Sequence, residues 1–299
     1  MDDEELAQAT SGLLGALPTS PLAQITSRSA LEGLERLHRR IFKDRTLTAV
    51  VGELFPEYSP QRVEEVASRI NLNAARSLCW KAIMSIPGKW AVKIDAPDRE
   101  ATAALRALSG PAILPFWHFG PHLMLTIAFR HIGVPVLVIS RAEPTLWTNA
   151  PDLLSMRIDV AGAGPQQAAT ALRRSLQHLK KGGKVAIAID GRLGANLVKV
   201  PFLGRQLVVA RGAAGLARLT GAPIIPCTMQ WTGNGWDMAI RVFDEVPYPD
   251  VPPTDTGEFE RSILTSIVRR FESYGRQYPG QFWITELGLL INCPTDVGQ

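Results

Sequence analysis

The chain has 299 residues, of which 46% are hydrophobic and 20% charged, and its formal net charge is only +4. This composition excludes a disordered chain, and the length is sufficient for one large α/β domain. The small basic surplus suits contact with anionic headgroups or phosphorylated carriers, but it is too dispersed for a protein that binds nucleic acid.

Cysteine usage and the start of the chain indicate a reducing compartment. Cys79, Cys227 and Cys293 are far apart and form no CxxC pair. We therefore expect buried thiols, with neither a disulfide framework nor a structural zinc site. The opening Met-Asp-Asp-Glu-Glu differs from the basic start of a secretory signal, and no apolar stretch is long enough for a transmembrane helix. The sequence predicts a cytoplasmic protein, and any membrane contact should be peripheral, on the inner face.

Residues 1–95 are predicted to form a helical N-terminal portion. Apolar residues recur at helical spacing between Leu31 and Ile41. A second helix is predicted to begin at Ser59-Pro60, because proline is favoured in the first helical turn. Its apolar stripe is formed by Val63, Val66, Ile70 and Ala74.

From residue 96, short apolar runs alternate with helical segments, which is typical of an α/β fold. The predicted strands are 112–117, 135–139, 185–189, 223–227 and 238–243. The predicted helices are 121–131, 166–181 and 209–219, followed by a long amphipathic helix from Phe259 to Tyr278. We expect a single domain over residues 1–299, in which 96–299 form an α/β core. Its central sheet should be largely parallel or mixed and flanked by helices.

Polar side chains follow three of these strands at the point where each strand ends. His118 follows the first strand, Arg141 and Glu143 follow the second, and Asp190 and Arg192 follow the third. Ligands of open parallel sheets bind beyond the carboxyl ends of the strands. The sequence therefore predicts a site at this edge of the sheet.

His118 is suited to act as a general base, because an imidazole with an ordinary pKa near ~6.5 is neutral at physiological pH. Phe119-Gly120-Pro121 is predicted to be a strand-to-helix turn. Its backbone N–H groups would then lie where an oxyanion or phosphate can bind, which makes Gly120 a candidate substrate-binding residue. The alternative is that His118 only caps the strand or the following helix.

The order of several motifs resembles the lysophospholipid acyltransferase superfamily, most closely its bacterial lipid A late acyltransferase branch. The segment His118–Leu123 resembles the histidine block, and Arg141 lies where the second block has its arginine. The segments 182–192 and 200–204 resemble the third block, and 219–226 the fourth. Leu54-Phe-Pro-Glu57 and Pro279-Gly-Gln-Phe-Trp283 are similar to flanking signatures. The resemblance covers roughly residues 34 to 285.

The resemblance implies acyl transfer from a thioester on acyl carrier protein or coenzyme A to a hydroxyl of a lipid, glycolipid or metabolite. It implies no bound cofactor, no metal and no covalent acyl-enzyme. In the family, an acid follows the histidine after four intervening residues. Its carboxylate orients the imidazole, as in serine hydrolase triads. Here that position is Leu123, which cannot accept a hydrogen bond.

We therefore expect Asp190 to orient His118, with Glu143 as the second choice and His122 as the third. His122 is also a candidate for binding substrate, although it can equally be a partly exposed helix residue. Arg141 and Arg192 are predicted to bind an anionic group of the acceptor or donor, unless each merely forms a surface salt bridge.

Two other functions fit the same residues. The first is a catalytically degenerate relative that binds acyl chains or carriers, and the second is a thioesterase in which water replaces the acceptor. The chain has no Gly-x-Ser-x-Gly motif, which argues against an α/β-hydrolase.

Overall fold

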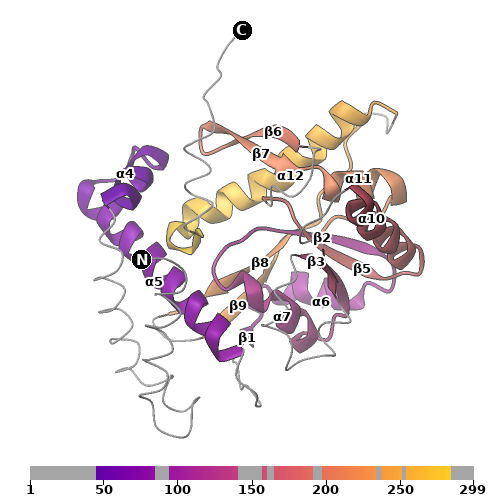
Figure 1. Ribbon diagram of the computed structural model, residues 1–299, viewed down its shortest axis with the longest axis horizontal. Helices are drawn as coiled ribbons and strands as arrows, with labels where there is room; N and C mark the ends of the chain where they lie inside the picture. Colours follow the sequence, from indigo (N-terminus) through magenta and orange to yellow (C-terminus); the bar gives the residue numbers. More distant parts are fainter. Residues whose placement is uncertain are drawn as a thin grey trace, which may run out of the picture.

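The computed structural model describes residues 45–84, 94–140, 157–159, 165–190, 197–233, 237–250 and 254–283. Within these residues a central sheet has the strand order β1-β9-β8-β2-β5-β3-β4 (Figure 1). The strands are β1 Ile94–Asp95, β2 Ala112–Phe116, β3 Val136–Ser140, β4 Arg157–Asp159, β5 Lys184–Ala188, β8 Cys227–Trp231 and β9 Met238–Val242.

The sheet is mixed and mostly parallel. Strands β8, β2, β5, β3 and β4 pair in parallel, β9 runs antiparallel to β8, and β1 is parallel to β9. Every residue of β2 is buried, as expected of a central strand covered on both faces. The predicted α/β class is confirmed.

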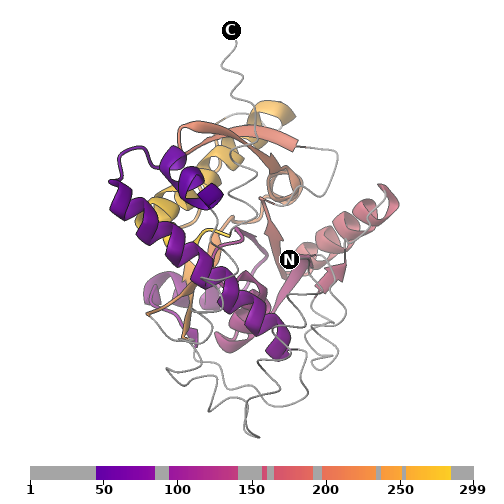
Figure 2. The ribbon, with the colours of Figure 1, turned by 60° about the vertical axis from the view of Figure 1, so that its left-hand side comes forward.

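Helices cover both faces of the sheet (Figures 1 and 2). They are α4 Arg45–Leu54, α5 Pro60–Met84, α6 Arg99–Ala107, α7 Leu125–His131, α10 Pro165–Lys180, α11 Gly212–Thr220 and α12 Thr256–Gln277, with the short 3₁₀ turns η1 His122–Met124 and η2 Pro279–Gln281. Alternate residues of β2 enter two cores, because successive side chains of a strand point to opposite faces. Ile113 packs into the core that includes α4, α5, α10, α11 and α12, and Leu114 into the core that includes α6 and α7.

The predicted helix 209–219 is partly wrong, because its beginning belongs to a hairpin. Strand β6, Leu197–Phe202, pairs antiparallel with β7, Arg205–Ala210, as a separate two-stranded sheet. The connecting Leu203 and Gly204 both have positive φ, of 48° and 72°. That combination is typical of the two-residue turns that suit the twist of a hairpin. The alternating apolar residues 197–209 thus pair as strands, and α11 begins only at Gly212.

Two other predicted boundaries also shift. In the predicted strand 223–227, Ile224 forms only isolated bridges, to Ile113 and Val246, and the regular strand starts at Cys227. Pro223 and Pro226 explain this shift, since proline has no N–H for a strand ladder. The predicted helix 121–131 begins as the 3₁₀ turn η1 before α7. The helical pattern of residues 31–41 lies outside the described residues.

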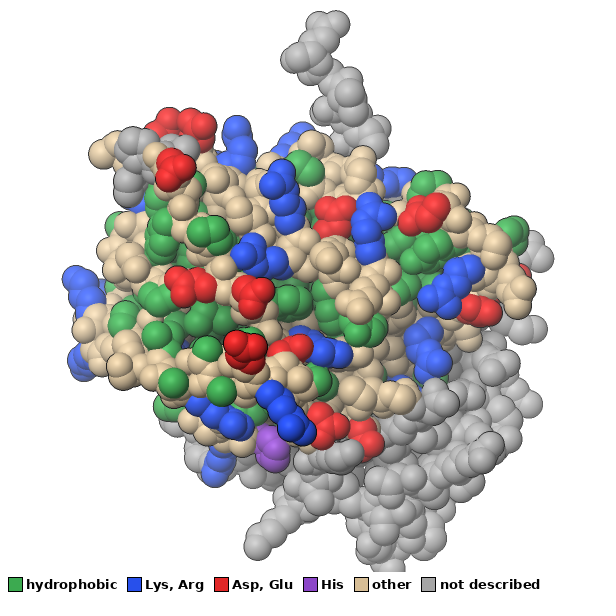
Figure 3. Space-filling view, turned by 180° about the vertical axis from the view of Figure 1, so that it is seen from behind, with side chains coloured by type: hydrophobic (Ala, Val, Ile, Leu, Met, Phe, Trp, Pro, Cys, Tyr) green, Lys and Arg blue, Asp and Glu red, His purple; other side chains and the backbone are tan. Residues whose placement is uncertain are grey.

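Charge is mixed on one face of the described surface. On the face shown in Figure 3, blue Lys and Arg side chains alternate with red Asp and Glu side chains, and neither sign forms one dominant area there. This agrees with the small, dispersed basic surplus of the sequence.

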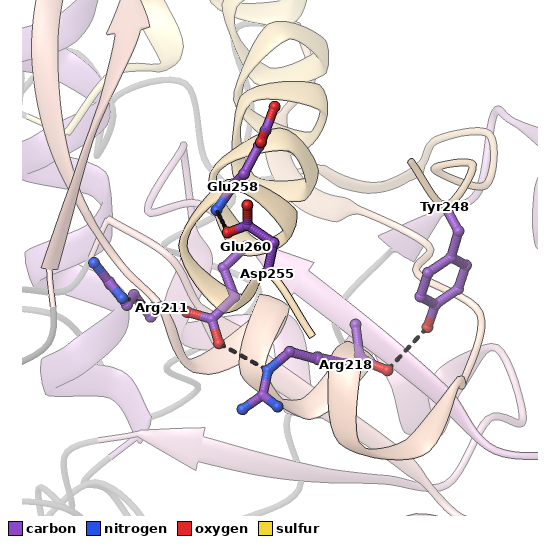
Figure 4. Close-up of polar contacts among 7 residues, drawn as sticks. Arg211, Arg218, Tyr248, Asp255, Glu258 and Glu260 are labelled. Atoms are coloured by element: carbon purple, nitrogen blue, oxygen red, sulfur yellow. Dashed lines mark hydrogen bonds and ion pairs between the residues drawn. The ribbon is translucent and has the colours of Figure 1, made fainter. Parts of the chain in front are cut away.

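Glu260 on α12 is a buried carboxylate that contacts two arginines at the ends of α11. Arg218 Nε lies 3.3 Å from Glu260 Oε1 and Arg211 Nη1 lies 3.6 Å from Oε2, while the Glu260 side chain is only 6% exposed (Figure 4). A buried charge is costly unless it is paired. This cluster therefore fixes α11 against α12.

The substitution Glu260→Gln should lower the free energy of unfolding by about 1–3 kcal/mol, because both arginines lose their anionic partner. Urea denaturation measures this. Glu64→Gln, at an exposed position of α5, is the control and should change stability by less than about 0.5 kcal/mol. Equal stability of Glu260→Gln and wild type would contradict the assigned role of the carboxylate.

Candidate active site

The ends of β2 and β5 bring His118 and Asp190 together. These adjacent parallel strands pair in register, with Phe116 opposite Ala188. His118 and Asp190 each lie two residues further on, and the Ile189 N–H donates to the Phe116 carbonyl at 3.1 Å, which continues the pairing. The two side chains thus meet at the carboxyl edge of the sheet, where ligands bind in such folds.

Asp190 holds His118 with both of its carboxylate oxygens. Oδ1 lies 2.7 Å from Nδ1 of the imidazole, and Oδ2 accepts the backbone N–H of His118 at 2.8 Å. The Asp190 side chain is 1% exposed, whereas that of His118 is 26% exposed. The expected pairing is therefore present in the structure, and the catalytic roles of the two residues stay predictions.

This geometry determines which ring nitrogen of His118 is basic. An ionised carboxylate can only accept hydrogen bonds, so the Asp190 contact assigns the proton to Nδ1 and leaves the lone pair on Nε2. The ring plane is set by edge contacts with Phe116, 5.7 Å away between centroids, and with His122, 4.6 Å away. A fixed tautomer and a fixed ring plane are what a general base requires.

His122, the first residue of η1, lies between His118 and Trp283. Its ring meets that of Trp283 at 79° with 5.1 Å between centroids, and its Nδ1 is buried. Burial, followed by the charge of the nearby His118, holds the pKa of His122 well below its ordinary value of 6.5. At neutral pH a second, uncharged imidazole thus lies beside His118.

The backbone N–H groups at the turn after His118 already donate hydrogen bonds within the protein. His118 N–H donates to Asp190, Phe119 N–H to the Trp117 carbonyl at 2.8 Å, and Gly120 N–H to the Gln281 carbonyl at 2.7 Å. The sequence-based expectation of available N–H groups in this turn is therefore wrong for these three residues. A substrate contact by Gly120 remains a prediction, but it cannot use this N–H without breaking the turn.

The remaining predicted site residues separate into two groups. Arg141, Glu143 and Arg192 lie outside the described residues. Leu123 is partly buried and packs against the apolar core beneath α7. The side chain at the family's acid position therefore contributes to packing, and the carboxylate beside His118 comes from Asp190, two residues beyond the end of β5.

Sequence reasoning did not identify Gln281 and Asn73, two buried polar residues below the turn. Asn73 lies on α5, and its Nδ2 donates to the Gly280 carbonyl at 2.7 Å. The pattern Pro279–Trp283 was visible in the sequence. Its contact with the histidine turn, however, joins segments far apart in the chain, which periodicity does not reveal.

Three further observations on the described residues concern metal binding, membrane-spanning helices and cysteines. No group of three or more described His, Cys, Asp or Glu side chains is placed to hold a metal ion. None of the described helices has the length and apolarity needed to span a bilayer. Cys227 is a buried free thiol whose pKa is raised by burial, as the sequence led us to expect. The side chains of Cys79 and Cys293 lie outside the described part.

A histidine held by a buried carboxylate at the edge of a mostly parallel sheet fits the acyltransferase class that the sequence motifs resemble. Residues 159–284 match the family model of the bacterial lipid A biosynthesis acyltransferases. This match confirms the resemblance to the lipid A late acyltransferase branch and supports an acyltransferase activity. The matched segment includes Asp190 and Gln281, and His118 precedes it. A search of curated proteins found no match.

Gly120 adopts a φ of +47°, and a Cβ added there would lie 2.8 Å from Gln281 Oε1 and 2.9 Å from the Met229 carbonyl oxygen. Gly120→Ala should therefore lower the free energy of unfolding by at least about 2 kcal/mol, through both the positive φ and the overpacking. Gly133→Ala is the matched control, because Gly133 has a φ of +71° and no atom within 4 Å of an added Cβ. Chemical denaturation should show Gly120→Ala to be the more damaging; equal losses would mean that the close packing costs nothing.

Stability should fall as the pH drops below about 6.5. His122 resists protonation in the folded state but not in the unfolded state, so the unfolded state binds more protons in this range and is favoured. His178, whose pKa is also lowered by burial, acts in the same direction. Melting temperatures between pH 7.5 and 5.5 should fall less steeply in His122→Gln than in wild type. His131→Gln, at an exposed position, should keep the wild-type slope, and an unchanged slope in His122→Gln would contradict the assignment.

Proposed function

We propose that this protein transfers an acyl group from a thioester, carried by acyl carrier protein or coenzyme A, to a hydroxyl of a lipid, glycolipid or metabolite. The observation that carries the proposal is the His118–Asp190 pair at the carboxyl edge of the sheet. The family match over residues 159–284 supports the same reaction class. In this proposal the protein needs no bound cofactor, because the thioester is a co-substrate.

In the proposed reaction, His118 Nε2 removes the proton of the acceptor hydroxyl while the hydroxyl oxygen attacks the thioester carbonyl carbon. The tetrahedral intermediate collapses with cleavage of the carbon–sulfur bond, and the leaving thiolate takes the proton from His118. Asp190 keeps the imidazole in the required tautomer and stabilises its protonated form. The carboxylate from β5 thus replaces the local acid that Leu123 does not supply.

The other predicted residues have roles on the substrate side in this proposal. Arg141 and Arg192 bind an anionic group of the donor arm or of the acceptor. His122 and Gly120 contact substrate next to His118, and the neutral state of His122 avoids a second buried cation there. The proposed location is cytoplasmic or peripheral at the inner membrane face, with no role in nucleic-acid binding.

The proposal is tested by following thioester consumption and ester formation with a panel of acyl donors and hydroxyl acceptors. His118→Ala should lose about 10²–10⁴-fold in rate, the usual contribution of a general base. Asp190→Asn should lose up to about 10⁴-fold, because the amide no longer selects the Nδ1–H tautomer. His131→Ala, an exposed histidine, is the control and should keep full activity. Wild-type turnover in His118→Ala would show that the assigned base is wrong.

The same assay separates the alternatives. A thioesterase releases free acid whether or not an acceptor is present, and a degenerate relative binds the donor without His118-dependent turnover. Leu123→Glu should give no gain in rate, because Nδ1 of His118 already has a carboxylate partner and Leu123 packs into the core. A large gain in this variant would show that Asp190 does not orient the base.

A further inference from the structure

The segment Gly280–Trp283 contacts the turn 119–122 almost residue by residue. The rings of Phe119 and Phe282 meet with 5.0 Å between centroids. Gly120 donates its N–H to the Gln281 carbonyl at 2.7 Å. The ring of His122 packs against that of Trp283. The backbone that carries His118 is thus supported along its length by a segment from the end of α12.

The Gln281 side chain is fixed at both of its polar atoms. Its Oε1 accepts the backbone N–H of Trp231 at 2.9 Å, and its Nε2 donates to the Trp231 carbonyl at 3.1 Å. The amide therefore forms two hydrogen bonds with the backbone of Trp231, the last residue of β8, as the backbone of a neighbouring strand would. All of these groups are buried, so their hydrogen bonds are costly to lose.

The same amide limits the space at Gly120. An added Cβ at Gly120 would lie 2.8 Å from Gln281 Oε1, so the side-chain oxygen packs directly against the glycine. Gln281 thereby contacts Gly120 in two ways, through its main-chain carbonyl and through its side-chain oxygen. Both contacts restrain a residue only two positions beyond His118.

A second layer of polar contacts fixes Gly280, the residue before Gln281, and reaches Gly120 itself. Asn73 Nδ2 donates to the Gly280 carbonyl at 2.7 Å, and Ser77 Oγ lies 2.9 Å from the Asn73 carbonyl and 3.5 Å from that of Gly120. Helix α5 therefore supports the Gly280–Trp283 segment from below. The chain of contacts runs from α5 to Gly280, along the backbone to Gln281 and from there to Gly120.

From these contacts we propose that Gln281 is a positioning residue for His118, acting through the backbone of Gly120. Asp190 fixes His118 at its own N–H and ring, and Gln281 fixes the chain on the other side of it, so the imidazole is restrained from both directions. A displacement of about 1 Å at a reacting group can cost on the order of 10²-fold in rate. The catalytic consequence rests on the proposed function, whereas the positioning of the ring can be measured without turnover.

The test uses Gln281→Met, which keeps the length of the side chain and removes both polar atoms. Gln277→Met, at an exposed position of α12, is the matched control. Four quantities are measured on the whole chain: the melting temperature, kcat, KM for acyl transfer, and the ¹⁵N shifts of the His118 imidazole. The ring signals are assigned by comparison with His118→Ala.

At a temperature where the variant is fully folded, Gln281→Met should lower kcat about 10- to 100-fold with KM within about threefold. It should also shift the His118 ¹⁵N signals away from the Nδ1–H tautomer, and Gln277→Met should do neither. If Gln281→Met lowers only the melting temperature, with wild-type kcat and wild-type His118 signals, the role is structural and the proposal is overturned.

If Gln281→Met does not fold, Asn73→Ala provides the same test, because it removes the hydrogen bond to the Gly280 carbonyl, together with the 3.3 Å hydrogen bond that Asn73 Oδ1 accepts from Arg76 on the same helix. It should change kcat and the His118 signals in the same direction, about threefold to tenfold in rate, and wild-type values for both would overturn the proposal. If wild type shows no acyl transfer at all, the proposed function fails. The His118 signals alone then decide whether Gln281 positions the ring.

Discussion

Strands β2 and β5 end side by side in parallel register, and the candidate site depends on this pairing. One residue of register shift would turn Asp190 to the other face of the sheet, since successive side chains of a strand alternate. In the observed register, one carboxylate binds both the ring and the backbone of His118. The position and the tautomer of the imidazole are therefore set by this pairing, before any substrate is considered.

The protein tolerates the buried carboxylate of Asp190 at this edge because both of its oxygens accept hydrogen bonds. Asp190 is almost completely buried, and an unpaired charge in such a place would be strongly destabilising. Its two oxygens instead receive a backbone N–H and a ring N–H. Glu260 follows the same rule at the α11–α12 contact, where two arginines approach one buried carboxylate. Each buried acid thus joins two elements that are not neighbours in sequence.

The His118–Asp190 pairing was predictable from the sequence, because it follows from the order of the strands. The apolar runs before His118 and before Asp190 predict buried strands, and parallel strands present their carboxyl ends at one edge. Because Leu123 excluded the family's local acid, Asp190 at the end of a neighbouring strand was the first choice to orient His118, ahead of Glu143 and His122. The pairing followed from the order of elements, without knowledge of side-chain positions.

What could not be predicted involves contacts over long chain separations or competing local preferences. Residues 205–210 lie almost directly before helix α11 and carry apolar residues, so the apolar pattern alone assigns them to that helix. Only the turn at Leu203 and Gly204, which joins β6 to β7, indicates that they form a hairpin strand. The link from Asn73 through Gln281 to Gly120 joins three distant segments. The residue pattern of any one segment does not reveal that link, because each contact forms only when all three segments are in place.

Drawing the carboxylate from β5 also changes when the site can form. With an acid at position 123, the base and its partner would sit within one turn of chain and could meet early. Here residues 118 and 190 meet only after β5 has added to β2, with α10 closed between them. The His118–Asp190 pair thus forms only when the sheet is complete, so partly folded chains and fragments that end before β5 carry the histidine without its partner.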